Sequence, residues 1–597
     1  MENIYDDKVK NKMLSRLFRK AEAAGAVSDT SESIGPMIDL VFISQFIGLD
    51  GVTVMGYAAP LIMLANLIGN SIANGARIKA APFLGSGNLV ETNRIFSNAA
   101  ILGGGSSFLA ALLIALFSGG VCFLLGVRDS NIFVITRQYI FGYIIGLPFL
   151  TLTKILKPYL QLEGQYRRCV ASSFMMTVID IAADAFVIFV LRGGMFEIAL
   201  ATSLSYVVAF LIDASFFFNK KNESQFRVSI KEFDYKSCLD MLRLGSSSLN
   251  YWGSRSLGGM IINNLLTSFK MPYFVATYGV FEHIKVYVRS AWSSPASNLL
   301  AFSGIFIGEE DKTMLKGVQK IALVHALICS SAAAVLIFVF AEPLARIFMK
   351  SSDPAATIMA VECIRVSCFS LPFHTIVYNF SMYLMAVKRI RFSNFYGFLI
   401  ECGALVPVTF LLLHVMGYHG AWAAKVVNVL VLSFIAIIYI YMNKEAEDFS
   451  DKMLLLPKSF GIPPENEISV ITRSEEEMED LSRVAIEFAM NHETDEDRAL
   501  TFGLIIEELG IFLAGHGFKD GKPHSINVRL VEKNGDLIIR MLDDCKPLNL
   551  TEYYKFLNTP KEKEEKEEEA DVVIIMDMAK QVIYTPTFGA NNLIIKI

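Results

Sequence analysis

Long apolar segments separated by polar breaks fill the first three quarters of the chain. Each holds about 20 residues or more, the length that an α-helix needs to cross the hydrocarbon core of a bilayer. The pattern predicts twelve membrane-spanning helices. These are residues 22–47, 52–78, 95–126, 131–160, 168–191, 195–218, 244–268, 273–305, 317–349, 356–387, 393–416 and 419–443.

The pattern changes after residue 444, where charged residues become frequent. "EISVITR" predicts a strand, and "EEEMEDLSRVAIEFAMNH" and "DRALTFGLIIEELGIFLAGHGF" predict helices. "HSINVRLVEKNGDLIIRMLDD" predicts a hairpin that turns at Asn534-Gly535. "VVIIMDMAKQ" predicts a further helix, and "VIYTPTFGANNLIIKI" predicts a last hairpin. We therefore expect an all-α polytopic membrane domain followed by an α/β sandwich domain over residues 467–597, which we call the tail.

Composition agrees with a membrane protein. Hydrophobic residues make up 53% of the chain and charged residues 19%, and the mean hydropathy is +0.44. We expect a lipid bilayer and a small-molecule substrate as partners, and a net charge of −5 gives no reason to expect nucleic acid. The N-terminus does not have the pattern of a cleaved signal peptide. The eight cysteines form no CxxC pair, so no metal or disulfide role is expected.

Lysine and arginine predict the orientation, because short cytoplasmic loops carry an excess of both. They gather in segment 1–20 and in every second break after it, including linker 221–243. The opposite breaks hold little more than Arg128, Arg192, Lys270 and Lys350. We therefore expect a multi-pass protein of the plasma membrane with both termini in the cytoplasm.

An internal repeat predicts two halves. "LPF" occurs at 147–149 and again at 371–373, and "FLGSGN" at 83–88 corresponds to "FIGEED" at 306–311, with an offset of 223–224 residues. We expect an N-lobe at 21–220 and a C-lobe at 244–445, each of six helices, and a linker at 446–466 before the tail. Two halves in the same orientation imply a pseudo-two-fold axis along the membrane normal, with substrate bound between them.

Several motifs resemble those of a known family. "PMIDLVFISQFIGLDGVTVMGYAAPL" combines a Pro, an Asp within an apolar run, a Gly-acidic turn and a second helix. "AAPFLGSGNLVETNRIFSNA" and "FIGEEDKTMLKGVQKIAL" are similar to equivalent loops of the two halves, and "VIDIAADAFVIFVLRGGMFEIALATSLS" is similar to the hairpin of helices 5 and 6. Together they resemble the MATE (multidrug and toxin extrusion) transporters over roughly residues 30–440.

This resemblance implies a transporter and not an enzyme. It would export organic solutes by alternating access, driven by inward flow of H⁺ or Na⁺, with the tail as a regulatory domain. Two alternatives stay open: a flippase of a lipid-linked or anionic precursor from the same superfamily, and a membrane sensor that signals through the tail.

Carboxylates within the predicted spans are candidates for ion coupling, because a charge at bilayer depth normally faces the bundle interior. Asp29, Glu32 and Asp39 lie on one face of the first predicted helix, and Asp180 and Asp184 lie one turn apart on the fifth. Asp39 matches the acidic position of the MATE motif, and Asp180 and Asp184 match positions that are polar or acidic in that family. Asp29 and Glu32 depart from the family pattern.

Carboxylates that share a site of low dielectric repel, which favours protonation of at least one of them. The cluster could therefore load and release H⁺, or hold Na⁺ through its oxygen atoms. One alternative is that these groups only form hydrogen bonds between helices. Another is that the acidic half of residues 22–47 is a cytoplasmic amphipathic helix. We expect no other cofactor and no metal.

Charges in the second half are of mixed sign. Arg255 and Glu401 lie in separate spans, and "VFEHIKVYVRSAW" places Glu282, Lys285 and Arg289 on one helix face. This set fits poorly with a cavity for lipophilic cations alone, so we expect it to contact an anionic or zwitterionic group of the substrate. The alternative is that Glu282 only neutralises Lys285 and Arg289.

The order of elements in the tail resembles a histidine-kinase-like ATPase domain of the anti-sigma-factor type. Glu508 matches the first motif, but Phe512 stands where a Mg²⁺-ligating Asn is expected, and a phenyl ring offers no oxygen. Asp543 in "DDCKP" matches the adenine-contacting position, whereas "EEEADVVIIMDM" replaces the Gly-rich phosphate turn. The resemblance implies a catalytically degenerate domain with doubtful ATP binding and a possible cytoplasmic protein partner.

Overall fold

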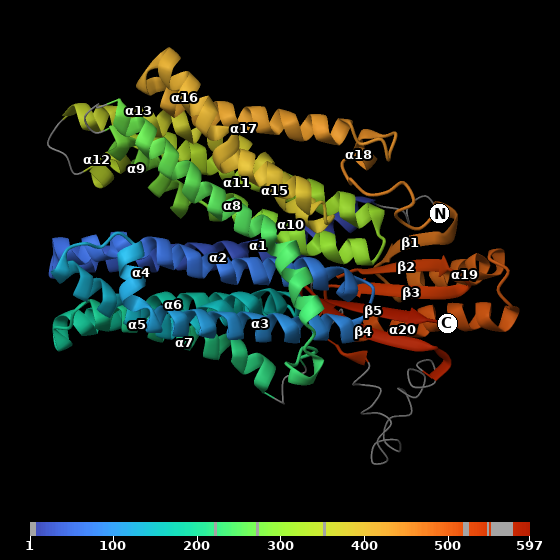
Figure 1. Cartoon of the computed structure of the whole chain (residues 1–597). Coiled ribbons are helices and arrows are strands. Elements are labelled where there is room, and N and C mark those ends of the chain that lie inside the picture. The colour runs from blue at the N-terminus through green and yellow to red at the C-terminus, as the bar shows by residue number, and fades with distance from the viewer. Residues whose placement is uncertain are drawn as a thin grey trace.

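The computed structural model describes residues 7–219, 224–269, 274–349, 354–517, 524–545, 548–550 and 577–597. Helices make up the chain up to Tyr441, and a small sheet with two helices adjoins one end of this helical array (Figure 1). The fold is therefore mostly helical, with a small C-terminal antiparallel sheet.

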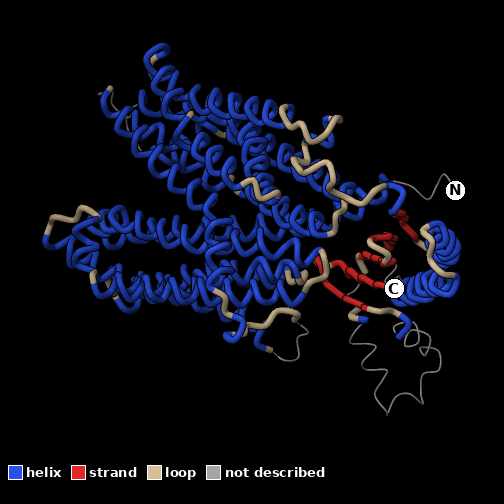
Figure 2. The backbone as a smooth tube through the Cα atoms, turned by 45° about the vertical axis from the view of Figure 1, so that its right-hand side comes forward, coloured by secondary structure: helices blue, strands red, loops and turns tan. Residues whose placement is uncertain are grey.

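The helices of the membrane domain gather in two groups, which lie side by side near the sheet and diverge toward the opposite end (Figures 1 and 2). We call the end next to the sheet the tail side. The first helix group contains α1 (Asp7–Phe42), α2 (Leu49–Gly85), α3 (Leu89–Leu116), α4 (Ser118–Leu124), α5 (Ser130–Leu162), α6 (Tyr166–Phe186) and α7 (Met195–Phe218). The second contains α8 (Tyr235–Ser268), α9 (Phe274–Tyr287), α10 (Ser290–Gly308), α11 (Lys312–Val339), α12 (Ala341–Met349), α13 (Pro354–Cys368), α14 (Ser370–Ala386), α15 (Ile390–Phe398), α16 (Leu405–Met416) and α17 (Tyr418–Tyr441).

All twelve predicted segments fall on helices, but fewer meet the length and hydropathy of a span. Among the described residues eight helices do so, or nine if α13 and α14, bent by 44° against each other, form one span. The predicted span 22–47 belongs to a helix that already begins at Asp7 and carries many charges. The structure divides four predicted spans into two helices each: 95–126 into α3 and α4, 273–305 into α9 and α10, 317–349 into α11 and α12, and 356–387 into α13 and α14. The exact number of spans and the symmetry of the halves remain predictions.

Glycines allow the two helix groups to approach closely on the tail side. A methyl group on Gly75 of α2 would overlap the carbonyl oxygen of Met241 in α8, and one on Gly245 of α8 would overlap that of Ser71 in α2. Ser71 Oγ also donates a hydrogen bond to Gly245 O at 2.9 Å. Small residues are the usual means by which helices pack closely in a membrane. We call this contact of α2 with α8 and α10 the tail-side seam.

The tail contains one five-stranded antiparallel sheet in the order β1-β2-β3-β5-β4. Its strands are β1 (Glu467–Thr472), β2 (Ile526–Lys533), β3 (Asp536–Asp543), β4 (Gln581–Thr587) and β5 (Ala590–Lys596). Helices α19 (Glu475–Asn491) and α20 (Glu496–Gly517) share a hydrophobic core with one face of this sheet. The turn predicted at Asn534-Gly535 is confirmed: both residues have positive φ, 57° and 83°, as a type I′ hairpin turn requires. Of the helix predicted at 572–581, residues 572–576 lie outside the described residues, Asp577 and Met578 are helical, and Gln581 begins β4.

The N-terminal segment is not a separate element, contrary to the boundary placed after residue 20. Met13, Leu14, Leu17 and Phe18 of α1 are buried in the core at the tail side of the membrane domain. Arg16 forms an ion pair with Asp544 of the tail. In sequence, the basic residues of the N-terminal segment predict a separate cytoplasmic segment. Its hydrophobic residues lie one turn apart, but the sequence does not show which other helices they pack against.

Candidate functional site

Asp39 of α1 and Asp180 and Asp184 of α6 lie together inside the first helix group. These residues are 5%, 5% and 0% exposed, and their carboxyl groups lie close enough to act on one another electrostatically. Helices α1 and α6 approach closely here because Gly35 has no side chain; a methyl group there would lie 3.0 Å from Asp180 Oδ2. The structure thus brings together three of the five predicted ion-coupling residues.

Asp29 and Glu32 lie nearer the tail side of α1 and have partners of their own. Asp29 Oδ2 accepts a hydrogen bond from Ser293 Oγ of α10 at 2.5 Å. Glu32 Oε1 pairs with Lys157 Nζ of α5 at 2.6 Å, and the same ammonium group donates to Ser173 Oγ at 2.6 Å. These contacts agree with the alternative that the two carboxylates join helices.

Sequence reasoning missed three ionisable residues in this region, one of them buried and two half-buried. Lys154 and Lys157 lie one turn apart on α5, and Asp213 of α7 is fully buried within electrostatic reach of Lys157. The signal that identified the other candidates also applies to these, because each is a charged residue within an apolar span.

In the second helix group the structure gives Glu282 partners other than those expected. Its carboxylate lies 3.3 Å from Arg255 Nη2 and 3.0 Å from Lys425 Nζ. The ion-pair partners of Glu282 therefore come from α8 and α17, while Lys285 also acts on Glu282 electrostatically. The alternative that Glu282 only neutralises Lys285 and Arg289 is not settled by these contacts. Helical spacing identifies neighbours on one helix, but it does not show which neighbouring helix approaches that face.

Cations near the boundary of the two groups are only partly matched by carboxylates. Lys154 Nζ donates to the amide oxygens of Asn66 and Asn70, at 2.5 and 3.4 Å. The guanidinium group of Arg289 lies 5.7 Å from the ring centroid of Trp252, and its buried Nε has no hydrogen-bond partner in the described part of the chain. Arg289 acts electrostatically on both Asp29 and Lys154.

Glu401 is the remaining predicted residue of this set. It lies in the π-helical segment Leu399–Gly403, is 6% exposed and interacts with Tyr251 and Arg255 of α8. The structure therefore places Arg255 in an ion pair with Glu282 and within electrostatic reach of Glu401.

In the tail, Asp543 has a structural role in the sheet. Its Oδ1 accepts hydrogen bonds from Asn591 Nδ2 at 2.7 Å and from the Cys545 N–H at 2.9 Å, which ties the end of β3 to β5. Burial raises the pKa of the Asp543 carboxyl, although these two donors oppose the shift. Glu508 is half-buried on α20, where Phe512 packs against the core of the tail.

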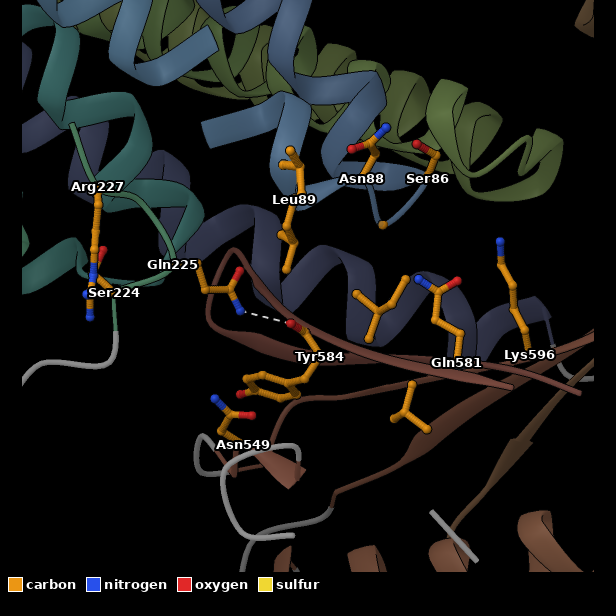
Figure 3. Close-up of a pocket in the computed structure, with 14 residues that line it drawn as sticks. Ser86, Asn88, Leu89, Ser224, Gln225, Arg227, Asn549, Gln581, Tyr584 and Lys596 are labelled. Carbon is orange, nitrogen blue, oxygen red and sulfur yellow. Dashed lines mark hydrogen bonds between the residues drawn. The ribbon is translucent and has the colours of Figure 1, made fainter. Parts of the chain in front are cut away.

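A pocket of about 870 Å³ lies between the first helix group and the tail. Residues of the α2–α3 loop, of segment 224–227 and of β4 line it (Figure 3). Across it Gln225 Nε2 donates a hydrogen bond to Tyr584 O at 2.8 Å, as the dashed line in Figure 3 shows. None of the predicted site residues lines this pocket.

Many apolar helices with ionisable side chains held between them are typical of a multi-pass membrane protein. The MatE family model matches residues 26–186 and 255–411, more than half of the chain, and the chain belongs to this family. MATE proteins are transporters and not enzymes. The tail lies beyond the matched residues.

Known relatives cover the membrane domain at low identity. The multidrug export protein MepA of Staphylococcus saprophyticus is 21% identical over 408 residues, 67% of this chain and 88% of MepA. The probable multidrug resistance protein YoeA of Bacillus subtilis is 21% identical over 423 residues, 67% of this chain and 89% of YoeA. The solved structure of a variant of the Vibrio cholerae MATE transporter VcmN has the same fold, with a TM-score of 0.68 at 17% identity, over 74% of this chain and 100% of VcmN.

Proposed function

We propose that this chain exports small organic solutes by antiport, driven by inward flow of H⁺ or Na⁺ and by alternating access between its two helix groups. The observation that carries the proposal is the buried cluster of Asp39, Asp180 and Asp184 in a member of a family with multidrug exporters. Ionised carboxylates in contact repel, so the cluster is stabilised when it holds a cation and destabilised when that cation leaves. These relatives also favour transport over signalling through the tail.

The orientation of the protein follows from charge and belongs to the same proposal. Lys and Arg are frequent in the N-terminal segment and in linker 221–243, whose described residues lie at the tail side. Under the positive-inside rule the tail side is therefore cytoplasmic. Both termini and the tail then lie in the cytoplasm beneath the plasma membrane. The N-lobe at 21–220 and the C-lobe at 244–445 would be the two moving bodies, and the tail a regulatory domain.

Transport in liposomes tests this proposal. Purified protein would be reconstituted, and a pH or Na⁺ gradient imposed in the presence of a panel of organic dyes. We expect dye to move against its gradient and the imposed ion gradient to collapse faster when dye is present. Movement of neither dye nor ion under any gradient would contradict antiport. Comparing the two gradients identifies the coupling ion.

A second candidate concerns the substrate, which we propose carries an anionic or zwitterionic group, as a lipid-linked precursor would. Lys154 and Arg289 support this, because neither is neutralised by an ion pair within 4 Å in the part of the chain that the structure describes. Both cations are half-buried, and the carboxylates that act on them, Asp29 and Glu32, are themselves engaged with Ser293 and Lys157, so a substrate anion would supply a further counter-charge.

Substituting these two cations separates the substrate classes. We expect Lys154→Gln and Arg289→Gln to reduce transport of anionic or zwitterionic substrates by about 10-fold each, the cost of a lost charge-assisted hydrogen bond, and to leave cationic dyes nearly unaffected. Arg346→Gln, an exposed residue of α12 paired with Glu342, is the control. Initial rates in the same liposomes measure the effect. If transport of every substrate class is unchanged, the cations have no role in substrate binding.

A further inference from the structure

The tail binds the membrane domain through the sheet face that α19 and α20 leave uncovered. Side chains alternate between the two faces of a strand, so Val528, Leu530 and Ile539 enter the core of the tail while Arg529 and Arg540 point to the other face. Arg529 and Arg540 stand directly opposite each other in the β2–β3 register. Like charges in that position destabilise a sheet unless other groups compensate them.

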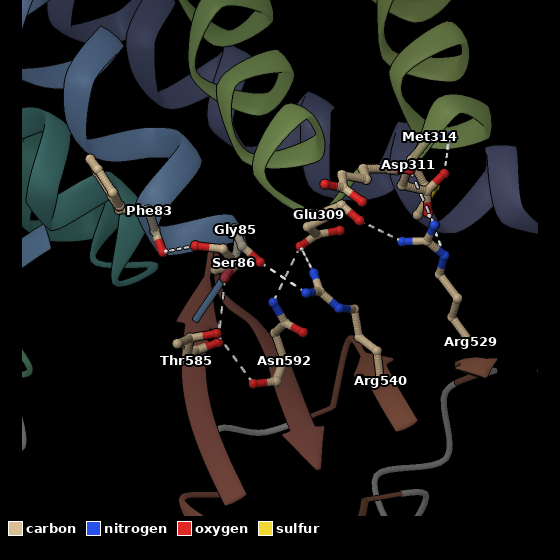
Figure 4. A network of polar contacts seen from close by, with 12 residues as sticks. Phe83, Gly85, Ser86, Glu309, Asp311, Met314, Arg529, Arg540, Thr585 and Asn592 are labelled. Carbon is tan, nitrogen blue, oxygen red and sulfur yellow. Dashed lines mark hydrogen bonds and ion pairs between the residues drawn. The ribbon is translucent and has the colours of Figure 1, made fainter. Parts of the chain in front are cut away.

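The compensating groups come from both helix groups (Figure 4). Arg540 Nη2 donates to the carbonyl oxygen of Gly85, the last residue of α2, at 2.9 Å. Its Nη1 lies 2.6 Å from Glu309 Oε1, directly after α10. The side chain of Arg540 is 13% exposed and that of Glu309 is 7% exposed. One buried arginine thus connects the tail-side ends of a helix from each group.

Arg529 holds the end of α10 in the same way. It donates to the carbonyl oxygen of Glu309 at 2.8 Å (Figure 4) and to that of Glu310 at 3.2 Å. Its guanidinium group is fixed by Glu467 of β1 at 2.9 Å. The last carbonyl groups of a helix have no partner within the helix, and the negative end of the helix dipole attracts cations. The arginines of the sheet therefore donate hydrogen bonds to carbonyl groups at these helix ends, which would otherwise accept them from water.

The tip of the β4–β5 hairpin reaches into the same junction. Phe588 is 2% exposed, and its ring stacks on Phe302 of α10 with centroids 3.7 Å apart and planes 6° from parallel. Its N–H donates to Leu162 O at the end of α5 at 2.8 Å, and Tyr166 Oη at the start of α6 donates to Phe588 O at 2.9 Å. Phe588 therefore contacts the second group through its ring and the first through its backbone.

The helix ends held by the tail are also the ends that meet in the tail-side seam. A methyl group on Gly85 would overlap the carbonyl oxygen of Ile305 in α10, and one on Gly308 would overlap that of Pro82 in α2. If the two groups move apart on this side, Gly85 and Glu309 separate. Arg540 then cannot keep both of its contacts.

We propose that the tail is a latch whose arginine-bearing sheet face docks on the ends of α2, α5 and α10 and holds the tail-side seam closed. Undocking is required before the seam opens, so the latch slows the transport cycle until it is released. This inference rests on the proposed transport function and assigns the tail its regulatory action. Any ligand or protein that binds the undocked sheet face better than the docked one would activate the transporter, because it shifts the equilibrium toward the undocked state.

The test uses the full-length chain with Arg540→Met and Phe588→Ala combined, and separately Glu309→Gln, which leaves the tail sequence intact. Arg483→Met, an exposed arginine of α19, is the control. Hydrogen–deuterium exchange over residues 80–90 and 300–312 reports on the seam, and initial transport rates in liposomes report on the cycle. We expect faster exchange at the seam and transport raised about 5-fold, the lower end of ordinary coupling between sites, with Arg483→Met unchanged.

Either of two results would overturn the latch. One is unchanged seam exchange in both the double variant and Glu309→Gln. The other is faster seam exchange together with slower transport, which would make the tail a support and not a restraint. The exchange measurement does not depend on transport. If neither the wild type nor the variants transport any substrate, but the variants exchange faster at the seam, the proposed antiport is refuted. The docking of the tail on the seam is then still supported.

Discussion

Asp39→Asn is expected to abolish gradient-driven transport, with a fall of about 100-fold or more, as when a positioned proton-transfer group is removed. Asp39 is 5% exposed and interacts with Asp184 in the buried cluster. Asparagine keeps the volume of the side chain but cannot take up or release a proton, and it removes the charge that would hold Na⁺. Dye efflux and ion influx, measured together in liposomes, should both fall to the background.

The control for this variant is Asp50→Asn, which changes an exposed carboxylate at the start of α2. It should transport at the wild-type rate. Dye binding without a gradient should survive in Asp39→Asn, because the variant removes coupling and not the contact between the helix groups. If Asp39→Asn still carries out gradient-driven efflux, the coupling site lies elsewhere, and the next candidates are Glu32 and Asp213.

Gly75→Ala is expected to open the tail-side seam. The added methyl group would overlap the carbonyl oxygen of Met241, and a backbone carbonyl cannot move aside as a flexible side chain can. Overpacking of this kind costs about 1–3 kcal/mol, which shifts an equilibrium between two states by about 5- to 150-fold. We expect a lower Tm, faster hydrogen–deuterium exchange over residues 70–90 and 238–250, and strongly reduced transport, because the closed-seam state is part of the cycle.

Gly56→Ala is a matched control on the same helix. It makes the same chemical change, but no atom lies within 4 Å of the methyl group it would add. Gly56→Ala should leave transport and seam exchange unchanged, and alanine favours the helix more than glycine does. Equal effects of the two substitutions would show that helix propensity, and not the approach of α2 to α8, causes the change.

The sequence predicted the helices of the membrane domain better than the contacts between them. Hydrophobic segments located the α-helical elements to within a few residues in most cases, because an apolar run of that length has few other structures available in a bilayer. The prediction failed at α1, where the helix extends back to Asp7, and at 95–126, 273–305, 317–349 and 356–387, where two helices replace each predicted span. A break of one or two residues inside an apolar run leaves no signal in hydropathy.

The candidate sites were predicted in part. The rule that an intramembrane charge faces the interior identified Asp39, Asp180 and Asp184, and the structure places them together. The same rule applied to α5 and α7 would have identified Lys157 and Asp213. Partners across helices were not predictable: Glu282 meets Lys425 of α17, which is 143 residues away in the chain.

By itself, the sequence determined that the chain is a membrane protein of the MATE type with a small α/β tail, since hydropathy, turn chemistry and motifs are local properties. Only the tertiary structure decided where the tail contacts the rest of the chain. Arg529 and Arg540 are two basic residues in strands, and the neighbouring sequence does not distinguish them from arginines on a solvent-exposed face of a sheet. Their role depends on carbonyl and carboxylate groups at the ends of α2 and α10, which come within hydrogen-bond reach only when the chain has folded.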